Sequence, residues 1–153
     1  MLLAGRIGIL RIVLTVVFSA SVISGCGKSG PQGGPRVTTV PVIGVVHVDG
    51  QPAANLRVTV HITGGTGAVP QNPGGFTKED GTFALSTYES GDGVPPGTYS
   101  CTFVWGEINL MNGQYSGDKL KGKYAKPETS TVTVTVSESD DTVDLGTITL
   151  TSG

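Results

Sequence analysis

The sequence predicts an all-β protein whose exported part is a single antiparallel β-sandwich. From Val40 onward, apolar and polar residues alternate with a period of two, turn residues recur at regular intervals, and no apolar stripe keeps a helical spacing. About seven strands, with few charges and many glycines, favour two packed sheets over a closed barrel. No internal repeat is evident, so we expect one domain.

The first two predicted strands cover residues 42–48 and 56–62, and a turn at 49–52 joins them. Alternation gives each strand one core face and one wet face. The predicted core faces consist of Val42, Gly44, Val46 and Val48, and of Leu56, Val58, Val60 and Ile62.

Two shorter segments, 76–78 and 82–86, flank the turn sequence Glu79-Asp80-Gly81. This pattern is typical of a hairpin in which Gly81 takes the positive φ that a tight turn requires. The sequence therefore predicts two further strands joined at Gly81.

The last three predicted strands cover 99–105, 132–136 and 143–150. In the last, Val143 and Leu145 are out of phase with Ile148 and Leu150, so Gly146 between them predicts a β-bulge. The other two strands present core faces of Tyr99, Cys101, Phe103 and Trp105, and of Val132, Val134 and Val136.

An export signal precedes these strands. Residues 1–11 contain two arginines and no acid, and the stretch from Ile12 to Ala20 is uncharged and apolar. A transmembrane helix needs roughly 20 apolar residues, and this run is too short. We therefore interpret residues 1–25 as a signal peptide.

The tetrad Ile23-Ser24-Gly25-Cys26 resembles the bacterial lipobox. The resemblance implies that Cys26 receives a lipid on its sulfur, which makes membrane lipid its partner. The alternative is an ordinary secretory signal that leaves Cys26 free to pair with Cys101. Gly27, in place of the Asp that marks inner-membrane retention in some lipoproteins, favours the outer membrane of a bacterial cell envelope.

Residues 26–36 are expected to form a Gly/Pro-rich tether and residues 37–153 the sandwich domain. Removal of 25 residues from 153 leaves a mature chain of 128. Without Arg6 and Arg11 it carries eight basic and twelve acidic residues, a net charge of −4. This balance argues against a nucleic-acid partner. With Cys26 lipidated, Cys101 should be a buried, unpaired thiol.

Three segments carry a family resemblance. They are VIGVVHVDGQP at 42–52, TKEDGTF at 77–83 and GDGVPPGTY at 91–99. Together they resemble the carboxypeptidase regulatory-like domain, which implies an immunoglobulin-like or prealbumin-like (transthyretin-like) sandwich. The lysine-rich segment 121–125 narrows the similarity to small bacterial lipoproteins. Such motifs specify a fold and not a chemistry.

The segment HVDGQPAANLRV at 47–58 is also similar to the opening of transthyretin-related hydroxyisourate hydrolases. That resemblance implies a water-activating role for His47. The chain lacks the family's Tyr-Arg-Gly-Ser tail and its further basic set. We expect His47 and His61 to lie on the outer faces of adjacent strands, and we expect no enzyme activity and no cofactor.

One basic cluster is a candidate contact surface for anionic lipid or an acidic glycan. It lies in the long connection 106–129 and consists of Lys119, Lys121, Lys123, Tyr124 and Lys126. A solvated loop is the alternative interpretation. The acidic stretches around Asp92 and at 137–141 lack calcium-loop spacing and are interpreted as turns, so we expect no metal site.

The sequence thus favours a membrane-anchored, non-catalytic envelope lipoprotein with an interaction module, whose partner is an envelope protein or a glycan. A carbohydrate-binding module is the first alternative and a transthyretin-related hydrolase the second. Sugar binding needs exposed aromatic platforms. The loop tyrosines Tyr88, Tyr115 and Tyr124 are the candidates, since Trp105 is in phase with the core.

Overall fold

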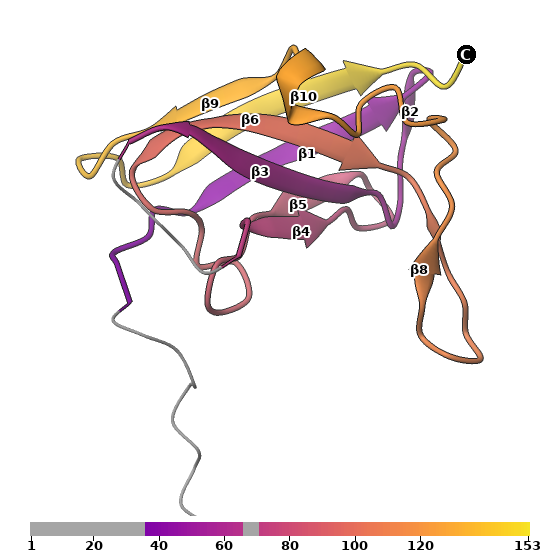
Figure 1. The fold of residues 1–153 in the computed structure, drawn as a ribbon, viewed down its shortest axis with the longest axis horizontal. Coiled ribbons are helices and arrows are strands. Elements are labelled where there is room, and N and C mark those ends of the chain that lie inside the picture. The colour runs from indigo at the N-terminus through magenta and orange to yellow at the C-terminus, as the bar shows by residue number, and fades with distance from the viewer. Residues whose placement is uncertain (1–35, 66–70) are drawn as a thin grey trace, which may run out of the picture. The chain divides into compact units, whose positions relative to one another are not determined.

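The computed structural model describes residues 36–65 and 71–153, which form ten β-strands and one short 3-10 helix (Figure 1). The predicted all-β class is confirmed. The signal peptide, Cys26 and the tether before Arg36 lie outside the described residues. The elements are β1 (Val42–Val48), β2 (Gln51–Pro52), β3 (Arg57–Gly64), β4 (Gly74–Phe76), β5 (Thr82–Ala84), β6 (Gly97–Val104), β7 (Glu107–Ile108), β8 (Tyr115–Ser116), η1 (Pro127–Thr129), β9 (Thr133–Val136) and β10 (Val143–Leu150).

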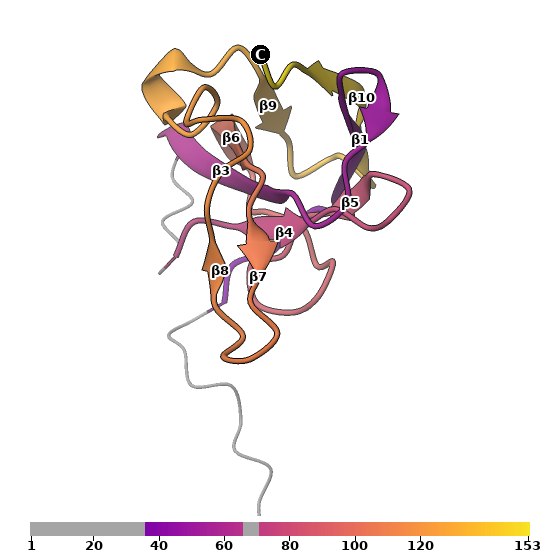
Figure 2. The same ribbon diagram turned by 90° about the vertical axis from the view of Figure 1, so that its right-hand side faces the viewer.

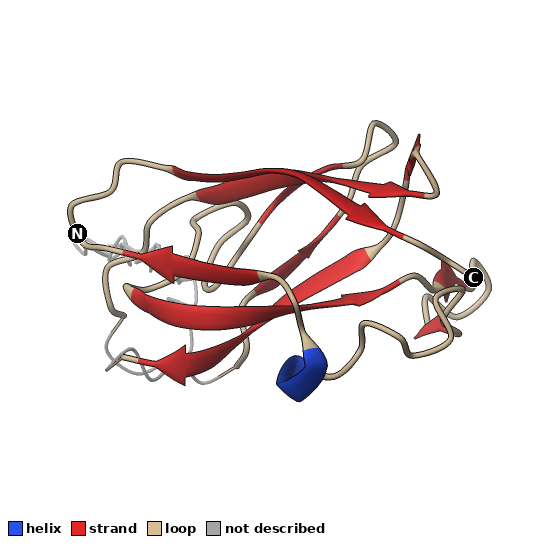
Figure 3. Ribbon diagram, turned by 90° about the horizontal axis from the view of Figure 1, so that it is seen from above, coloured by secondary structure: helices blue, strands red, loops and turns tan. Residues whose placement is uncertain are grey.

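Two four-stranded sheets face each other. In the first, β1 pairs with β10 on one side and with β2 and β5 on the other; the second has the order β4-β3-β6-β9. The end-on view in Figure 2 shows the two sheets opposite one another, and Figure 3 shows the same layers from above. A separate hairpin of β7 and β8 projects from the end of the sandwich.

The core fills the space between the two sheets, and the period of two selects its residues as predicted. Val46 and Val48 face it from β1, and Val58 and Val60 face it from β3. Burying each such side chain stabilises the fold by roughly 1.5–3 kcal/mol relative to leaving it exposed. The apolar core residues run from Val40 to Leu150.

The last strand, β10, forms one edge of the first sheet and differs from the other strands in its direction. β10 runs parallel to β1, whereas every other pairing among the described strands is antiparallel. The register shifts where Ile43 pairs with Asp144 and Val45 with Thr147, so two residues of β10 oppose one of β1. Gly146 lies in this bulge with a φ of +62°, which confirms the predicted irregularity.

The predicted hairpin at 76–86 is confirmed at its turn and is wrong only in its main pairing. Its two arms share a bond from the Lys78 N–H to the Thr82 carbonyl at 2.8 Å and an antiparallel bridge between Gly74 and Ser86. Its turn exists, because Gly81 has a φ of +78° and its N–H donates to the Lys78 carbonyl at 3.0 Å. However, β4 pairs with β3 in the second sheet and β5 pairs with β1 in the first. The turn therefore carries the chain from one sheet to the other. Alternation defines a strand's faces but not its hydrogen-bonding partner.

Two predicted core positions also differ. Ile62 is exposed, because the register between β3 and β6 shifts after it and the strand end leaves the core. Trp105 lies just beyond the end of β6 and is half-buried against the core. Both residues follow the alternation, but they lie where the sheets no longer cover one another.

The long connection 106–129 is more ordered than its sequence suggests. It contains the β7–β8 hairpin and η1, and between them Leu120 is buried in the core. Within the described ranges, the structure contains no helix with the length and apolar character needed to span a bilayer.

Candidate functional site

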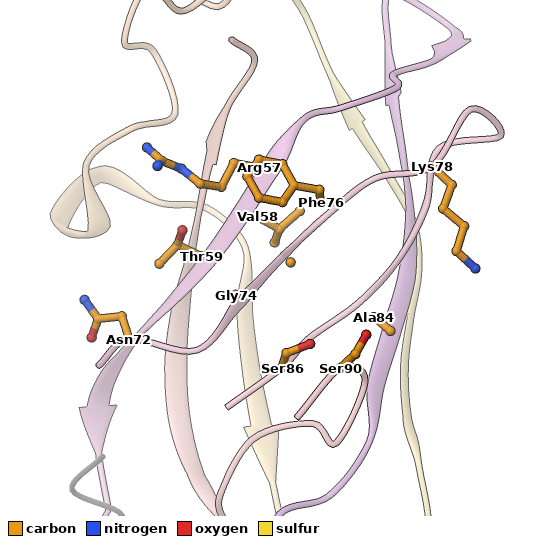
Figure 4. Close-up of a pocket in the computed structure, with 11 residues that line it drawn as sticks. Arg57, Val58, Thr59, Asn72, Gly74, Phe76, Lys78, Ala84, Ser86 and Ser90 are labelled. Carbon is orange, nitrogen blue, oxygen red and sulfur yellow. The ribbon is translucent and has the colours of Figure 1, made fainter. Parts of the chain in front are cut away.

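An open cleft of about 550 Å³ lies along β4, between β3 and the segment that follows β5. Figure 4 shows the side chains that line it. Polar and cationic groups come from three segments of the chain, and one aromatic ring stands at the side of the cleft. The side chains that give it chemical character are Arg57, Asn72, Phe76, Lys78, Ser86 and Ser90.

Two glycines explain why the cleft is open. A Cβ atom on Gly74 would lie 2.7 Å from the Val58 carbonyl oxygen, and a Cβ atom on Gly75 would overlap the Ala84 carbonyl oxygen. Only glycine lets β4 approach both neighbouring backbones this closely. Because neither residue has a side chain, the middle of β4 leaves the cleft unfilled.

Phe76 is the exposed aromatic of this cleft, with 48% of its surface accessible. Its ring meets the ring of Tyr115 edge to face, and the Arg57 guanidinium lies 5.2 Å from the centroid of the same Tyr115 ring. The Tyr115 ring thus contacts both the Phe76 ring and the Arg57 guanidinium. The sequence prediction missed Phe76 because it treated the residue as part of a hairpin strand.

The cleft suits a ligand that carries hydroxyl groups and negative charge. The Arg57 and Lys78 side chains offer N–H donors with positive charge, and Asn72, Ser86 and Ser90 can donate or accept hydrogen bonds. The exposed face of Phe76 can pack against an apolar surface of such a ligand. The pair Gly74-Gly75 before an aromatic residue was the sequence signal for this site.

Two of the tyrosines expected as binding platforms, Tyr88 and Tyr115, have structural roles, and so does Trp105, which was expected in the core. The Tyr88 hydroxyl accepts the Val37 N–H, and the Trp105 indole N–H donates to the Ala54 carbonyl at 3.0 Å. The Tyr115 hydroxyl accepts the Gly106 N–H at 2.6 Å. The Trp105 ring is also covered by Lys119, whose Nζ lies 5.0 Å from its centroid.

Two lysines of the basic cluster Lys119–Lys126 make contacts within the protein. Lys119 pairs with Glu107 at 3.0 Å, and Lys123 donates to the Thr151 hydroxyl at 2.7 Å. A hydrogen bond with the same Thr151 side chain is the main cause that lowers the pKa of Tyr124. All four lysines of the cluster are exposed, and the partner of Lys123 is a neutral hydroxyl, so Lys121, Lys123 and Lys126 present their charge to solvent.

The two histidines do not lie on adjacent strands, which corrects the sequence expectation. His47 is in β1 and His61 in β3, on the outer faces of the two opposed sheets, with the core between them. His61 contacts the Thr102 hydroxyl through Nε2 at 3.0 Å and the Asn72 amide through Nδ1 at 3.1 Å. The histidines therefore do not converge on one site.

Cys101 occupies the core position that the alternation predicts. It is a free, buried thiol, and burial raises its pKa to about 11. A thiol in this state is protonated at neutral pH and is a poor nucleophile. Cys26, the predicted lipidation site, lies outside the described residues.

The two acidic segments form turns, as predicted. The Asp92 carboxylate accepts the N–H groups of Thr87, Tyr88 and Glu89, and the Asp140 carboxylate accepts the Ser137 N–H. Among residues 36–65 and 71–153, no group of three or more His, Cys, Asp or Glu side chains is placed to hold a metal ion.

No protein-family model matches the chain, and no curated protein sequence matches it. Among solved structures, the chain is similar to a 9R-lipoxygenase from Cyanothece, with 14% identity, a TM-score of 0.41, and coverage of 74% of this chain and 16% of that one. It is also similar to DUF3823 family proteins from Bacteroides ovatus and Parabacteroides merdae, at 11% and 16% identity and TM-scores of 0.39 and 0.36. These alignments cover 73% and 76% of this chain and 44% and 46% of those proteins. The chain spans less than half the length of each.

Proposed function

We propose that this protein is a lipid-anchored, non-catalytic binding module of the bacterial cell envelope. The anchor is a thioether-linked lipid on Cys26, supported by the lipobox-like tetrad Ile23-Ser24-Gly25-Cys26. The residue after the cysteine, Gly27, favours the outer membrane. The observation that carries the binding role is the open cleft along β4, where charged, polar and aromatic side chains gather over a glycine floor.

The chemistry of the cleft favours binding over catalysis. Arg57 and Lys78 attract an anionic ligand, whereas neither His47 nor His61 lines the cleft. Nucleophilic or acid–base catalysis requires a nucleophile and a base in mutual contact. Thr59, Ser86 and Ser90 are the hydroxyl groups that line the cleft, and no histidine lies among its lining residues.

A carbohydrate ligand is the second candidate, and the position of Phe76 favours it. An exposed ring beside amide and hydroxyl groups is a common arrangement for packing against a sugar while hydrogen-bonding its hydroxyls. The two cations then select an acidic glycan. The third candidate, a transthyretin-related hydrolase, requires His47 to act with a further basic set, and His47 lies on the outer face of the first sheet, away from the cleft.

We also infer that the sandwich belongs with the carboxypeptidase regulatory-like, transthyretin-like domains. The three sequence segments that carry this resemblance fall at positions with strict backbone requirements. Gly50, Gly81 and Gly93 all have positive φ values, of 82°, 78° and 88°. Motif glycines at such turns support a shared fold, because they are required by backbone conformation.

The anchor is tested by the substitution Cys26→Ala in the full chain. Loss of the only acylated thiol should release the protein from the membrane fraction or stop its maturation. Cys101→Ala is the matched control, because it removes the other cysteine and should leave the protein in the membrane fraction. Unchanged, detergent-extractable membrane association of Cys26→Ala would exclude the lipoprotein assignment.

The cleft is tested by affinity capture from chemically crosslinked envelopes and by binding of soluble acidic polysaccharide. Arg57→Gln combined with Lys78→Gln should abolish capture of a specific partner or polysaccharide. Lys121→Gln combined with Lys126→Gln removes the same charge from the basic cluster, leaves the contacts of Lys119 and Lys123 intact, and serves as the control. Loss of binding in the second pair alone would assign the contact to the basic cluster instead.

A further inference from the structure

The tip of the β7–β8 hairpin is the most exposed apolar feature of the described chain. Leu110 and Met111 are 96% and 97% exposed, and Ile108 at the end of β7 is 46% exposed. No charged residue occurs between Glu107 and Asp118. A hairpin that only linked two strands in water would gain nothing from apolar side chains at its tip.

The backbone of this tip is largely satisfied by the hairpin itself. The Gly113 N–H donates to the Asn109 carbonyl at 2.7 Å, and the Asn109 N–H donates to the Gln114 carbonyl at 2.8 Å. Side-chain amides complete the turn, since Asn109 accepts the Met111 N–H and Asn112 accepts the Gln114 N–H. Internal pairing lowers the cost of moving a backbone segment out of water.

The base of the hairpin is fixed to the sandwich by Tyr115. Its hydroxyl bonds the Gly106 N–H and lies 2.8 Å from the Val104 carbonyl, while its ring packs against Phe76. The tip is therefore presented in a defined direction and does not fold back onto the core.

That direction is the side from which the chain enters the domain. In Figures 1 and 2 the hairpin and the first described residues, 36–39, both extend downward from the sandwich, at opposite ends of its long axis in Figure 1. Nine residues lie between Cys26 and Arg36, and the ten steps from one to the other span at most about 35 Å. With a lipid on Cys26, the point of entry at Arg36 lies within about 35 Å of the bilayer surface.

We propose that the β7–β8 hairpin is a second membrane contact, which inserts Leu110 and Met111 into the interfacial region of the bilayer that holds the Cys26 lipid. The inference rests on the lipid anchor of the proposed function. Two contacts in one chain orient the domain, and the tether gives the hairpin a high local concentration at the membrane. The intrinsic affinity of the tip can therefore be low.

The composition of the tip favours a bilayer over a protein partner. Protein–protein hot spots are enriched in Trp, Tyr and Arg, and residues 108–114 contain none of these. The segment instead combines long aliphatic side chains with uncharged amides, which suit the boundary between headgroups and acyl chains. The segment carries no cation, so its binding does not depend on anionic lipid headgroups.

The test uses the full, lipidated chain reconstituted in phosphatidylcholine vesicles and a fluorescent probe on a single introduced thiol. Met111→Cys places the probe at the tip, and Thr129→Cys in η1, on the opposite side of the sandwich in Figure 1, is the matched control. The native Cys101 is buried and should not react. Vesicle co-sedimentation that depends on Cys26 confirms the anchor independently of the probe.

We expect bromine-labelled lipids to quench the probe in Met111→Cys at least about threefold more than the probe in Thr129→Cys, because interfacial elements lie about 5–10 Å deep. Adding Leu110→Ser should remove most of that difference.

Equal exposure of both probes to aqueous iodide in anchored protein would overturn the hairpin contact and leave the anchor intact. Self-quenching between tips, without lipid quenching, would assign the tip to a second copy of the chain and overturn the inference. Sedimentation independent of Cys26 would instead count against the anchor.

Discussion

The ring of Phe76 in β4 meets the ring of Tyr115 in β8 edge to face, with centroids 5.2 Å apart and an interplanar angle of 70°. This contact joins the two surface features of the domain. Phe76 lines the cleft, and Tyr115 fixes the base of the projecting hairpin. A change at either ring should therefore affect both the cleft and the hairpin.

Tyr115→Phe should destabilise the domain by about 1–3 kcal/mol, because the buried Gly106 N–H loses its acceptor. Urea unfolding measures the change. Tyr88→Phe is the control, since its hydroxyl accepts only an exposed N–H at 3.2 Å and its loss should cost less than about 0.5 kcal/mol. Equal losses for the two variants would contradict the role given to Tyr115.

Gly81→Ala and Gly50→Ala separate backbone strain from steric overlap. Both glycines have a φ near +80°, so both substitutions share the conformational cost. Only at Gly81 would the new Cβ atom meet backbone, 2.6 Å from the Val46 carbonyl oxygen, whereas nothing lies within 4 Å at Gly50. We expect Gly81→Ala to lower the free energy of unfolding by about 1–3 kcal/mol more than Gly50→Ala. Gly81→Val should be worse still.

Cys101 should resist thiol reagents in the native domain and react only after unfolding. Because its pKa in the fold, about 11, lies above the value in the unfolded chain, the folded state holds the proton more tightly. This contribution to stability is complete below the unfolded pKa, about 8.5, and is lost as the pH rises toward about 11. Cys101→Val should cost less than about 1.5 kcal/mol and abolish this alkaline loss. Rapid stoichiometric labelling of the native domain would disprove the burial.

The contact between Asp49 and Ser152 should make stability depend on acid pH. The Ser152 hydroxyl and N–H both donate to the Asp49 carboxylate, and these bonds lower the pKa of Asp49. A lowered pKa contributes stability above the unfolded value, about 3.9, and that contribution disappears as the pH falls through the folded value. Asp49→Asn should therefore destabilise at pH 7, and in thermal melts its difference from wild type should shrink as the pH falls below the unfolded value. Asp141→Asn, which removes the same charge elsewhere, is the control.

Several local properties follow from the sequence alone, because they depend on short-range rules. Alternation assigns Cys101 and Val46 to the core, and both are buried. Turn chemistry assigns a positive φ to Gly81, and the break in alternation assigns a bulge to Gly146; both are observed. These features need only the residue's own backbone requirement or the facing of its neighbours two positions away.

The tertiary structure decided which strands meet. Alternation predicts that 76–78 and 82–86 are extended, but the sheet to which each belongs is set by hydrogen bonds to β3 and β1, distant in the sequence. The cleft exists because those two partners differ and because Gly74 and Gly75 lie between them. The exposure of Phe76 depends on the same long-range pairing, which the period of a strand does not encode. Leu110 and Met111 lie in a local hairpin, whose direction is set by the contacts of Tyr115 with Phe76 and with the Asn55 carbonyl.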